Sequence, residues 1–280
     1  MADEITKRSS ETWEAVAPAW EMNRDRIFEA TRAISDRLVA LLDPSSGQRV
    51  LEIAAGTGET GFLLAEQLGA DGRLISTDFS DAMVRAAQRG AAARGLDRVE
   101  CRVMDAQSID LPEGAVDSVL SRFGLMLVTN PSRVLGEAHR VLRPGGRLAY
   151  AVWGPPDANP WITLLAGAVI QRGHALGGDP FGPGGLFSMA EPERNLQLVT
   201  AAGFAEVAAE EHSGAMRADD IDDYWYFQAS ISGPIAVLLA GLPSDEHDAI
   251  RAAFRSTAQS YRRGAGFELP FRAVIVHATR

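Results

Sequence analysis

Apolar and polar positions along this chain change between two periods, which predicts alternating strands and helices. Runs of branched apolar residues are typical of buried parallel strands, and apolar spacings of three or four are typical of the helices that connect them. Residues 3–43 keep the helical spacing throughout, so the first strand comes after them. Short apolar runs predict seven strands, at 50–53, 73–78, 99–104, 116–121, 147–152, 205–211 and 269–277.

Two longer segments interrupt this alternation, at about 154–190 and 214–266. Both are rich in helix formers and aromatic residues, and they lie after the fifth and sixth predicted strands. We expect them to form helical cap insertions over the sheet. The predicted fold is α/β, a Rossmann-like, seven-stranded, mostly parallel sheet with helices on both faces, in which residues 46–280 form one domain behind an N-terminal helical segment, 1–45.

The stretch from Arg49 to Gly61, R-V-L-E-I-A-A-G-T-G-E-T-G, joins a strand, a glycine turn and a helix. Gly56 and Gly58 allow a tight turn and let a ligand come close to the backbone. The free N–H groups and the dipole of the following helix face that turn. Glu52 lies near the carboxyl end of the strand, where open parallel sheets bind their ligands. This combination predicts a nucleotide-type cofactor site.

Two cofactors compete for such a site. Gly56, Gly58 and Gly61 match the dinucleotide pattern G-x-G-x-x-G, and Asp78 follows Gly58 by twenty residues. However, Glu52 would repel a pyrophosphate and attract an amino group, and a second acid, Asp105, ends the third strand. A ligand with an ammonium group, a ribose and an adenine but no phosphate fits these residues better. S-adenosylmethionine is such a ligand.

The chain resembles the class I methyltransferases, and locally the resemblance is strongest to the ubiquinone/menaquinone C-methyltransferase group. It covers roughly residues 12–153. The class is matched by Glu52-x-Ala54-x-Gly56-x-Gly58, Asp78, Asp105-Ala106 and the run R-V-L-R-P-G-G from Arg140 to Gly146. The group is matched by Ala54 in place of glycine, by F-G-L-M-L-V-T from Phe123 to Thr129, and by V-A-P-A-W-E-M-N from Val16 to Asn23.

This resemblance implies S-adenosylmethionine as cofactor and residues 1–45 as a helical lid over it. The implied cofactor-binding residues are Trp20, Glu52, Ala54, Gly56, Thr57, Gly58, Asp78, Phe79, Met83, Asp105, Ala106 and Arg122. Asp78 would accept both ribose hydroxyls, although it or Ser80 could simply cap the next helix. Asp105 would accept the adenine amino group. Phe79 and Met83 would flank the adenine or join the core.

The methyl acceptor is expected at the end of the fourth strand, which faces the transferred methyl in class I folds. The predicted substrate-binding residues are Phe123, Trp153, Trp161 and Trp225. They would line a mostly apolar cavity beside Phe123, unless they only pack the cap onto the sheet. The related quinone group carries Arg-Asn where this chain has Met126-Leu127, which favours an apolar small molecule over a quinone, methylated at carbon or oxygen.

Composition narrows the choice of partner. The 280 residues are 46% hydrophobic, enough for one substantial core. The net charge of −10 and the absence of a dense arginine run argue against nucleic acid. The N-terminus lacks the apolar core of a signal peptide, and no apolar run reaches the roughly 18 residues of a membrane span. We expect a cytoplasmic monomer or homodimer that acts on a small molecule.

No catalytic base or metal site is predicted. Cys101 is the only cysteine, and the five histidines form no Ser/His/Asp or metal-ligand pattern. Two alternatives to a small-molecule methyltransferase remain at this point. One is an NAD(P)-dependent oxidoreductase, for which the sequence offers no Tyr-x-x-x-Lys pair because Lys7 is its only lysine. The other is a non-catalytic protein that keeps the cofactor fold.

Overall fold

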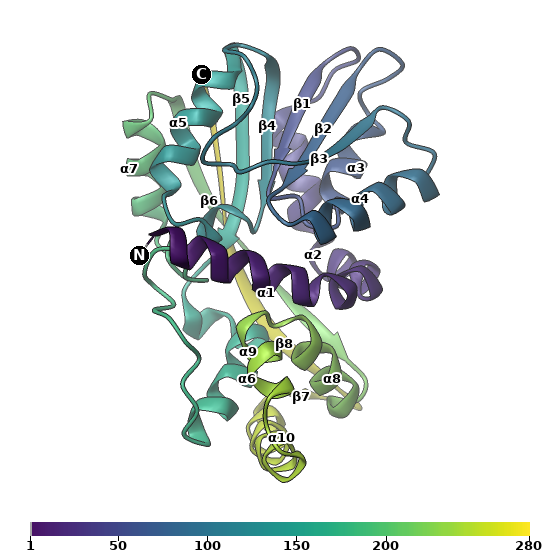
Figure 1. The fold of residues 1–280 in the computed structure, drawn as a ribbon, viewed down its shortest axis with the longest axis vertical. Helices are drawn as coiled ribbons and strands as arrows, with labels where there is room; N and C mark the ends of the chain where they lie inside the picture. The colour runs from purple at the N-terminus through teal and green to yellow at the C-terminus, as the bar shows by residue number, and fades with distance from the viewer. Residues whose placement is uncertain (1) are drawn as a thin grey trace.

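A single sheet runs through the molecule (Figure 1). The computed structural model describes residues 2–280 of the chain, with side chains from residue 7 onward. Met1, the first residue of the predicted lid, lies outside the described residues. The strands are β1 (Arg49–Ile53), β2 (Arg73–Asp78), β3 (Val99–Val103), β4 (Val116–Arg122), β5 (Leu142–Trp153), β6 (Ala205–Ala218), β7 (Arg262–Arg263) and β8 (Gly266–Thr279).

The strand order is β3-β2-β1-β4-β5-β8-β6, with the two-residue β7 paired to β8. The neighbours from β3 to β5 are parallel, and β8 runs antiparallel between β5 and β6. The predicted seven-stranded, mostly parallel sheet is therefore confirmed, with β7 as a short addition. From β1 the chain moves outward to β3, and from β4 it moves outward in the opposite direction, so the ends of β1 and β4 meet at the point where the order reverses.

The helices are α1 (Ala2–Met22), α2 (Arg24–Leu42), α3 (Glu59–Ala65), α4 (Asp81–Ala93), α5 (Pro131–Val141), α6 (Pro160–Gln171), α7 (Pro192–Ala201), α8 (Ile221–Ile231), α9 (Pro234–Ala240) and α10 (Ser244–Ala258). Right-handed crossovers in opposite directions put α3 and α4 on one face of the sheet and α5 on the other. α2 packs on α3, and α7 packs on α5. Short 3-10 turns cover Leu125–Leu127, Pro156–Ala158 and Gln259–Tyr261.

The sheet buries its apolar side chains against α2 on one face and α5 on the other. Ile34 and Leu38 of α2 are fully buried, as are Val134 and Leu135 of α5. The periodic spacing read from the sequence thus marks the inward stripes of these helices. This packing holds the carboxyl ends of β1, β2 and β4 in fixed relation, which is what positions the site.

The cap helices gather around a ribbon that extends from the sheet. β5 stops pairing with β8 at the pair Trp153–Ala273, whereas β6 and β8 continue together to the pair Ala218–Phe267. α6, α8, α9 and α10 lie around this outer part of the ribbon, and α1 crosses between it and the sheet (Figure 1). The cap is therefore carried by two strands of the sheet.

Several predicted strand boundaries differ from the structure, and two of them differ by five residues or more. β6 continues past the predicted end at residue 211 to Ala218, because its outer half pairs with β8 beyond the sheet, where partial exposure of both faces leaves no clear alternation. β5 begins at Leu142 instead of 147. The predicted turn at residues 144–146 pairs with the C-terminus, since Gly145 N donates to Arg280 O and Arg280 N donates to Gly146 O, both at 2.8 Å.

Across residues 2–280, no helix is at once long enough and apolar enough to span a bilayer.

Candidate active site

The loop after β1 has the left-handed backbone that its glycines predicted. The φ angles of Gly56 and Gly58 are +58° and +90°, and Ala54 is also left-handed at +50°. A Cβ on Gly56 would meet no atom within 4 Å, so its backbone borders open space. A Cβ on Gly61, by contrast, would overlap the Glu52 carboxylate. The third glycine of the literal dinucleotide pattern is therefore explained by packing against Glu52.

Glu52 holds the inner side of this loop. Its side chain is buried, and its two oxygens accept the Gly61 N–H and the Ser76 hydroxyl, each at 2.8 Å. Burial raises the pKa of Glu52 to about 8, while those two hydrogen bonds and the charge of Arg122 act in the opposite sense. Glu52 thus joins β1 to β2 and α3. Its contact with a cofactor amino group stays a prediction.

Asp78 joins the loop to the start of α4. Its Oδ2 accepts the Gly56 N–H at 2.9 Å, and its Oδ1 accepts the Ser80 N–H at 2.9 Å. Burial raises the pKa of Asp78 to about 6, against the effect of these backbone donors. Ser80 caps α4 by accepting the Met83 N–H. Ser80, and not Asp78, is therefore the side chain that caps α4. The Asp78 carboxylate lies beside the glycine loop, and its ribose role stays a prediction.

The residues flanking this carboxylate differ in burial. Phe79 is half-buried and Met83 is buried. Met83 therefore joins the core, which was one of its two expected roles, and Phe79 keeps a partly exposed ring beside Asp78.

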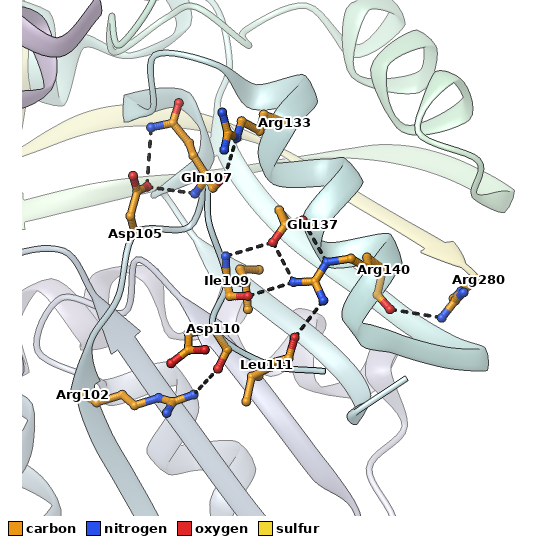
Figure 2. Close-up of polar contacts among 10 residues, drawn as sticks. All are labelled: Arg102, Asp105, Gln107, Ile109, Asp110, Leu111, Arg133, Glu137, Arg140 and Arg280. Atoms are coloured by element: carbon orange, nitrogen blue, oxygen red, sulfur yellow. Dashed lines mark hydrogen bonds and ion pairs between the residues drawn. The ribbon is translucent and has the colours of Figure 1, made fainter. Parts of the chain in front are cut away.

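The loop after β3 carries Asp105, which is exposed, and Ala106, which is buried. Asp105 Oδ1 accepts the Gln107 N–H at 2.8 Å, and Arg133 Nε of α5 donates to Gln107 O at 2.6 Å (Figure 2). Asp105 is therefore exposed and hydrogen-bonded only within its own loop, among the described residues, while Gln107 is tied to α5. The predicted adenine contact is untested by this geometry.

Arg140, from the quoted R-V-L-R-P-G-G run, fixes the rest of that loop. Its guanidinium donates to Ile109 O at 2.8 Å and to Leu111 O at 2.7 Å, and it pairs with Glu137 one turn earlier (Figure 2). Glu137 also accepts the Ile109 N–H at 3.0 Å, and the Arg140 partner lowers the pKa of Glu137. We call the pair Glu137 and Arg140 the α5 clamp. Its role is to position the loop after β3.

Buried charges beneath the glycine loop were not foreseen from the sequence. Thr57, a predicted cofactor residue, donates its hydroxyl to Glu59 at 2.5 Å. The other oxygen of Glu59 lies 3.4 Å from Arg24 Nε of α2. Glu59 reads as an ordinary acidic residue in the first turn of a helix, and Arg24 as one arginine among many. Only the packing of α2 on α3 brings them together.

Arg122, predicted to contact the cofactor, turns toward α2. Its Nη1 donates to the Thr31 hydroxyl at 2.5 Å. Burial lowers the pKa of Arg122, and the nearby carboxylates of Glu59 and Glu52 act against that shift. Arg122 thus adds a second positive charge to the buried group under the loop.

The end of β4 meets an aromatic cluster. Phe123 has a left-handed backbone with φ of +61°, which is rare for a bulky residue. Its ring stacks on Trp153 at 3.6 Å between centroids, and Trp153 meets Trp161 edge-on at 4.9 Å. Three of the four predicted substrate residues are thus brought together. Trp225 instead packs on Phe254 of α10 at 5.3 Å, within the cap.

Trp161 carries a buried indole N–H that has no hydrogen-bond partner among the residues that the structure describes. An unpaired buried donor costs about 1–3 kcal/mol, so its position in an otherwise apolar cluster needs a reason.

α1 connects the sheet to the cap. Trp20 Nε1 donates to Ile231 O at the end of α8 at 2.9 Å, and the Trp13 ring meets Trp20 edge-on. Glu14 accepts the Ser80 hydroxyl at 2.7 Å, next to Asp78. α1 crosses between the cap and the sheet (Figure 1), and both the lid role of this segment and direct contact of Trp20 with the cofactor stay predictions.

Two surface recesses of about 280 and 190 Å³ lie at the amino ends of the strands. The lining of the larger recess includes Leu41 and His277, and that of the smaller one includes Asp117 and Arg143. Arg147 lines both recesses. They lie away from every predicted site residue, so the apolar cavity beside Phe123 stays a prediction. Within the described residues, no three His, Cys, Asp or Glu side chains gather as metal ligands.

Comparison with known proteins agrees with this geometry. Residues 44–155 match a family model described as a methyltransferase domain. A demethylmenaquinone methyltransferase of Thermus thermophilus is 33% identical over 202 residues, which cover 68% of this chain and 90% of that protein. Nocamycin O-methyltransferase of Saccharothrix syringae is 31% identical, covering 65% of this chain and 69% of that protein.

Among solved structures, the YcgJ protein of Bacillus subtilis has the same fold. The superposition has a TM-score of 0.59 with 16% identity and covers 88% of this chain and 97% of that one. The fold is thereby shared beyond recognisable sequence similarity, while the two curated relatives carry the family assignment. The chain belongs to the class I S-adenosylmethionine-dependent methyltransferases and is an enzyme of that type.

Proposed function

We propose that this enzyme transfers the methyl group of S-adenosylmethionine to a carbon or oxygen atom of a small, apolar acceptor. The observation that carries the proposal is the meeting of two unlike surfaces where the strand order reverses. Carboxylates and a left-handed glycine loop border the ends of β1 and β2, and stacked aromatic rings border the end of β4.

The chemistry of the donor set supports this cofactor over a dinucleotide. Glu52 and Asp78 are buried beside the loop, and Glu14 lies next to Asp78. Asp78, whose pKa of about 6 lies below neutral pH, and Glu14 beside it disfavour the pyrophosphate of a dinucleotide and favour a ligand with a positive charge and hydroxyl groups. Glu52 has a pKa of about 8, and a ligand ammonium group would favour its ionised form. Asp78 would hold the ribose, Asp105 the adenine, and the backbone of Gly56 and Gly58 the part of the cofactor nearest the loop.

The bound cofactor supplies a methyl group on a positively charged sulfur, which reacts by in-line displacement. The chain's part is then to align the acceptor and to exclude water. Phe123, Trp153 and Trp161 provide apolar surface for the acceptor beside the end of β4. The unpaired indole N–H of Trp161 would donate to an oxygen of that acceptor.

The acceptor class is supported by the same residues and by the relatives. Met126 is buried and Leu127 is partly buried, three and four positions after Phe123, and both are apolar. The two curated relatives are named for methylation of a quinone and of nocamycin, both small molecules. N-terminal helices 1–45 would form the lid, and the segments 154–190 and 214–266 the cap over the acceptor.

The test measures thermal unfolding with S-adenosylmethionine, S-adenosylhomocysteine and NAD in parallel. The first two should raise the unfolding temperature, and NAD should leave it unchanged. A stabilisation by NAD alone would overturn the cofactor assignment. Formation of S-adenosylhomocysteine is then followed with planar phenols, naphthols and enolisable ketones as acceptors. Turnover of polar acceptors such as glycine, with none of these apolar ones, would overturn the acceptor class.

A further inference from the structure

Thr57, Glu59 and Arg24 form a chain of contacts from the glycine loop to the N-terminal helices. The Thr57 hydroxyl donates to one oxygen of Glu59 at 2.5 Å, and the other oxygen lies 3.4 Å from Arg24 Nε. Only 3% of the Glu59 side chain and 13% of the Arg24 side chain are exposed. The facing atoms, Glu59 Oε1 and Arg24 Nε, have no hydrogen-bond partner elsewhere among the described residues.

Arg24 also reaches the second helix of the site. Its Nη2 donates to Ala86 O of α4 at 3.0 Å, and a Cβ on Gly90 of α4 would overlap its guanidinium. The side chain therefore touches α3, which follows the glycine loop, and α4, which follows Asp78. Arg24 is itself the first residue of α2. A single side chain thus ties α2 to both helices that begin at the cofactor loops.

The second cation near Glu59 depends on α2 as well. The Glu59 carboxylate acts to raise the pKa of Arg122, against the larger lowering by burial, and the Arg122 guanidinium donates to the Thr31 hydroxyl of α2. If α2 moved away, Glu59 would keep its buried charge while its cationic partners moved or lost their support. Leaving a buried charge unpaired is strongly unfavourable. Docking of α2 and the shape of the loop at Thr57 are thereby coupled.

We propose that Arg24 and Glu59 are positioning residues that couple docking of the N-terminal helices to cofactor affinity, acting through Thr57. The inference rests on the proposed function, since it concerns the same cofactor site. Linkage makes the coupling reciprocal: if docking of α2 favours the cofactor, the bound cofactor favours docking of α2 by the same factor. Neither residue is required to touch the cofactor.

The test is calorimetric titration with S-adenosylhomocysteine. Arg24→Met and Glu59→Gln should each weaken its binding about tenfold, a usual size for such coupling. The double variant should lose no more than the stronger single variant, because the two residues act as one unit. Thr57→Val should reproduce the Glu59→Gln loss, and Arg24→Lys should recover part of the Arg24→Met loss.

Arg37→Met is the matched control, because Arg37 also lies on α2 and pairs with a carboxylate, Glu210, that is far from the loop. It should change the affinity less than twofold. Hydrogen exchange adds an independent readout: S-adenosylhomocysteine should slow exchange in α1 and α2 of the wild type but not of Glu59→Gln. If Arg24→Met does not fold, the double variant, which removes both charges of the Arg24–Glu59 pair, takes its place.

The outcomes separate the two proposals. A wild type that does not bind S-adenosylhomocysteine would contradict the proposed function. A wild type that binds, with Arg24→Met and Glu59→Gln both within twofold of it, would overturn the coupling alone. Losses that add fully in the double variant, or an equal loss in Arg37→Met, would also overturn it, because they indicate separate contacts or general loosening of α2.

Discussion

The two halves of the site are built from different interactions. At the ends of β1 and β2, buried carboxylates each accept identified backbone or hydroxyl donors, as Glu52 and Asp78 do. At the end of β4, Phe123 and Trp153 touch by ring stacking. The strength of a hydrogen bond to a carboxylate depends on the exact position of one donor atom, whereas the strength of ring stacking depends on the area of contact. The cofactor half should therefore respond sharply to small chemical changes, and the acceptor half gradually.

The strongest test of this contrast is Gly56→Val. The φ of +58° is strained for a β-branched residue, and the added methyl groups would enter the open space beside the loop. We expect S-adenosylhomocysteine binding to weaken by roughly 100-fold or more, on the scale of strain plus lost contact. The measurement is calorimetric titration of the folded variant.

Gly95→Val is the matched control for that experiment. Gly95 has a φ of +65° and equally open surroundings, but it follows the C-terminal end of α4, whereas the cofactor loops lie at the N-terminal end of that helix. It should lose stability by a similar amount and keep its affinity. Equal affinity losses in the two variants would mean that strain alone, and not the ligand's approach to Gly56, is responsible.

Asp78→Asn sharpens the contrast through pH. With a pKa of about 6, wild-type Asp78 becomes protonated below that pH, so cofactor affinity should fall about tenfold from pH 7 to pH 5. The variant should bind about tenfold more weakly at pH 7, within the usual range for a hydrogen bond to a charged group, and lose this pH dependence. Titrations at three pH values check both.

Stability should change in the opposite sense. The pKa of Asp78 in the folded protein lies above its usual value of 3.8, so ionising this carboxyl is less favourable in the folded than in the unfolded chain. The unfolding free energy of the wild type should therefore fall as pH rises from about 4 through about 6. Asp78→Asn should not show that loss. A wild-type affinity that is flat between pH 5 and pH 7 would remove the ionised carboxylate from the ribose role.

Arg140→Lys tests whether the cofactor half also depends on the α5 clamp. Lysine cannot reproduce the fork that reaches Ile109 O, Leu111 O and Glu137 together. We expect a loss of about 1–2 kcal/mol in unfolding free energy and faster hydrogen exchange in residues 105–111. Arg143 pairs with Asp117 and has a more exposed side chain than Arg140, so Arg143→Lys should cost less than about 0.5 kcal/mol. Similar costs for both would reduce the clamp to a surface ion pair.

The smallest effect is expected in the aromatic half. Trp161→Phe and Trp225→Phe remove the same atoms from two buried positions. Of the two, only Trp161 has a buried N–H that lacks a partner within the described part of the chain. Trp161→Phe should therefore be the less destabilising of the two, by about 1 kcal/mol in urea unfolding. Its KM for an acceptor that carries an oxygen should rise more than that of Trp225→Phe. The reverse order in KM would assign the indole N–H to packing alone.

The clustering of the predicted cofactor residues at one edge of the sheet could be predicted because they follow strand ends at set spacings. Glu52, Gly56 and Asp78 each stand where a parallel strand meets its loop, and the parallel order of β1 and β2 brings them together. Composition and periodicity also predicted the sheet, whose order depends on local crossovers. These features are encoded by neighbours in the sequence.

The features that escaped prediction depend on distant partners. Arg24 and Glu59 are 35 positions apart and meet only through the packing of α2 on α3. The outer half of β6 is defined by its pairing with β8, and the stack of Phe123 on Trp153 by the alignment of β4 with β5. Trp225 was assigned by its aromatic character, which core and binding surfaces share.

The cap is attached to the sheet through the two-stranded ribbon of β6 and β8, which extends beyond the end of β5. An unbroken ladder from Ser213–Arg272 to Ala218–Phe267 carries the helices without a flexible joint, so swinging them open would require bending paired strands. α1, in contrast, is anchored to the cap by the bond from Trp20 to Ile231 O and to the sheet side by Glu14. Because α1 is held by side-chain hydrogen bonds and not by a paired ladder, we expect the N-terminal helices, and not the cap, to move when the reaction centre opens.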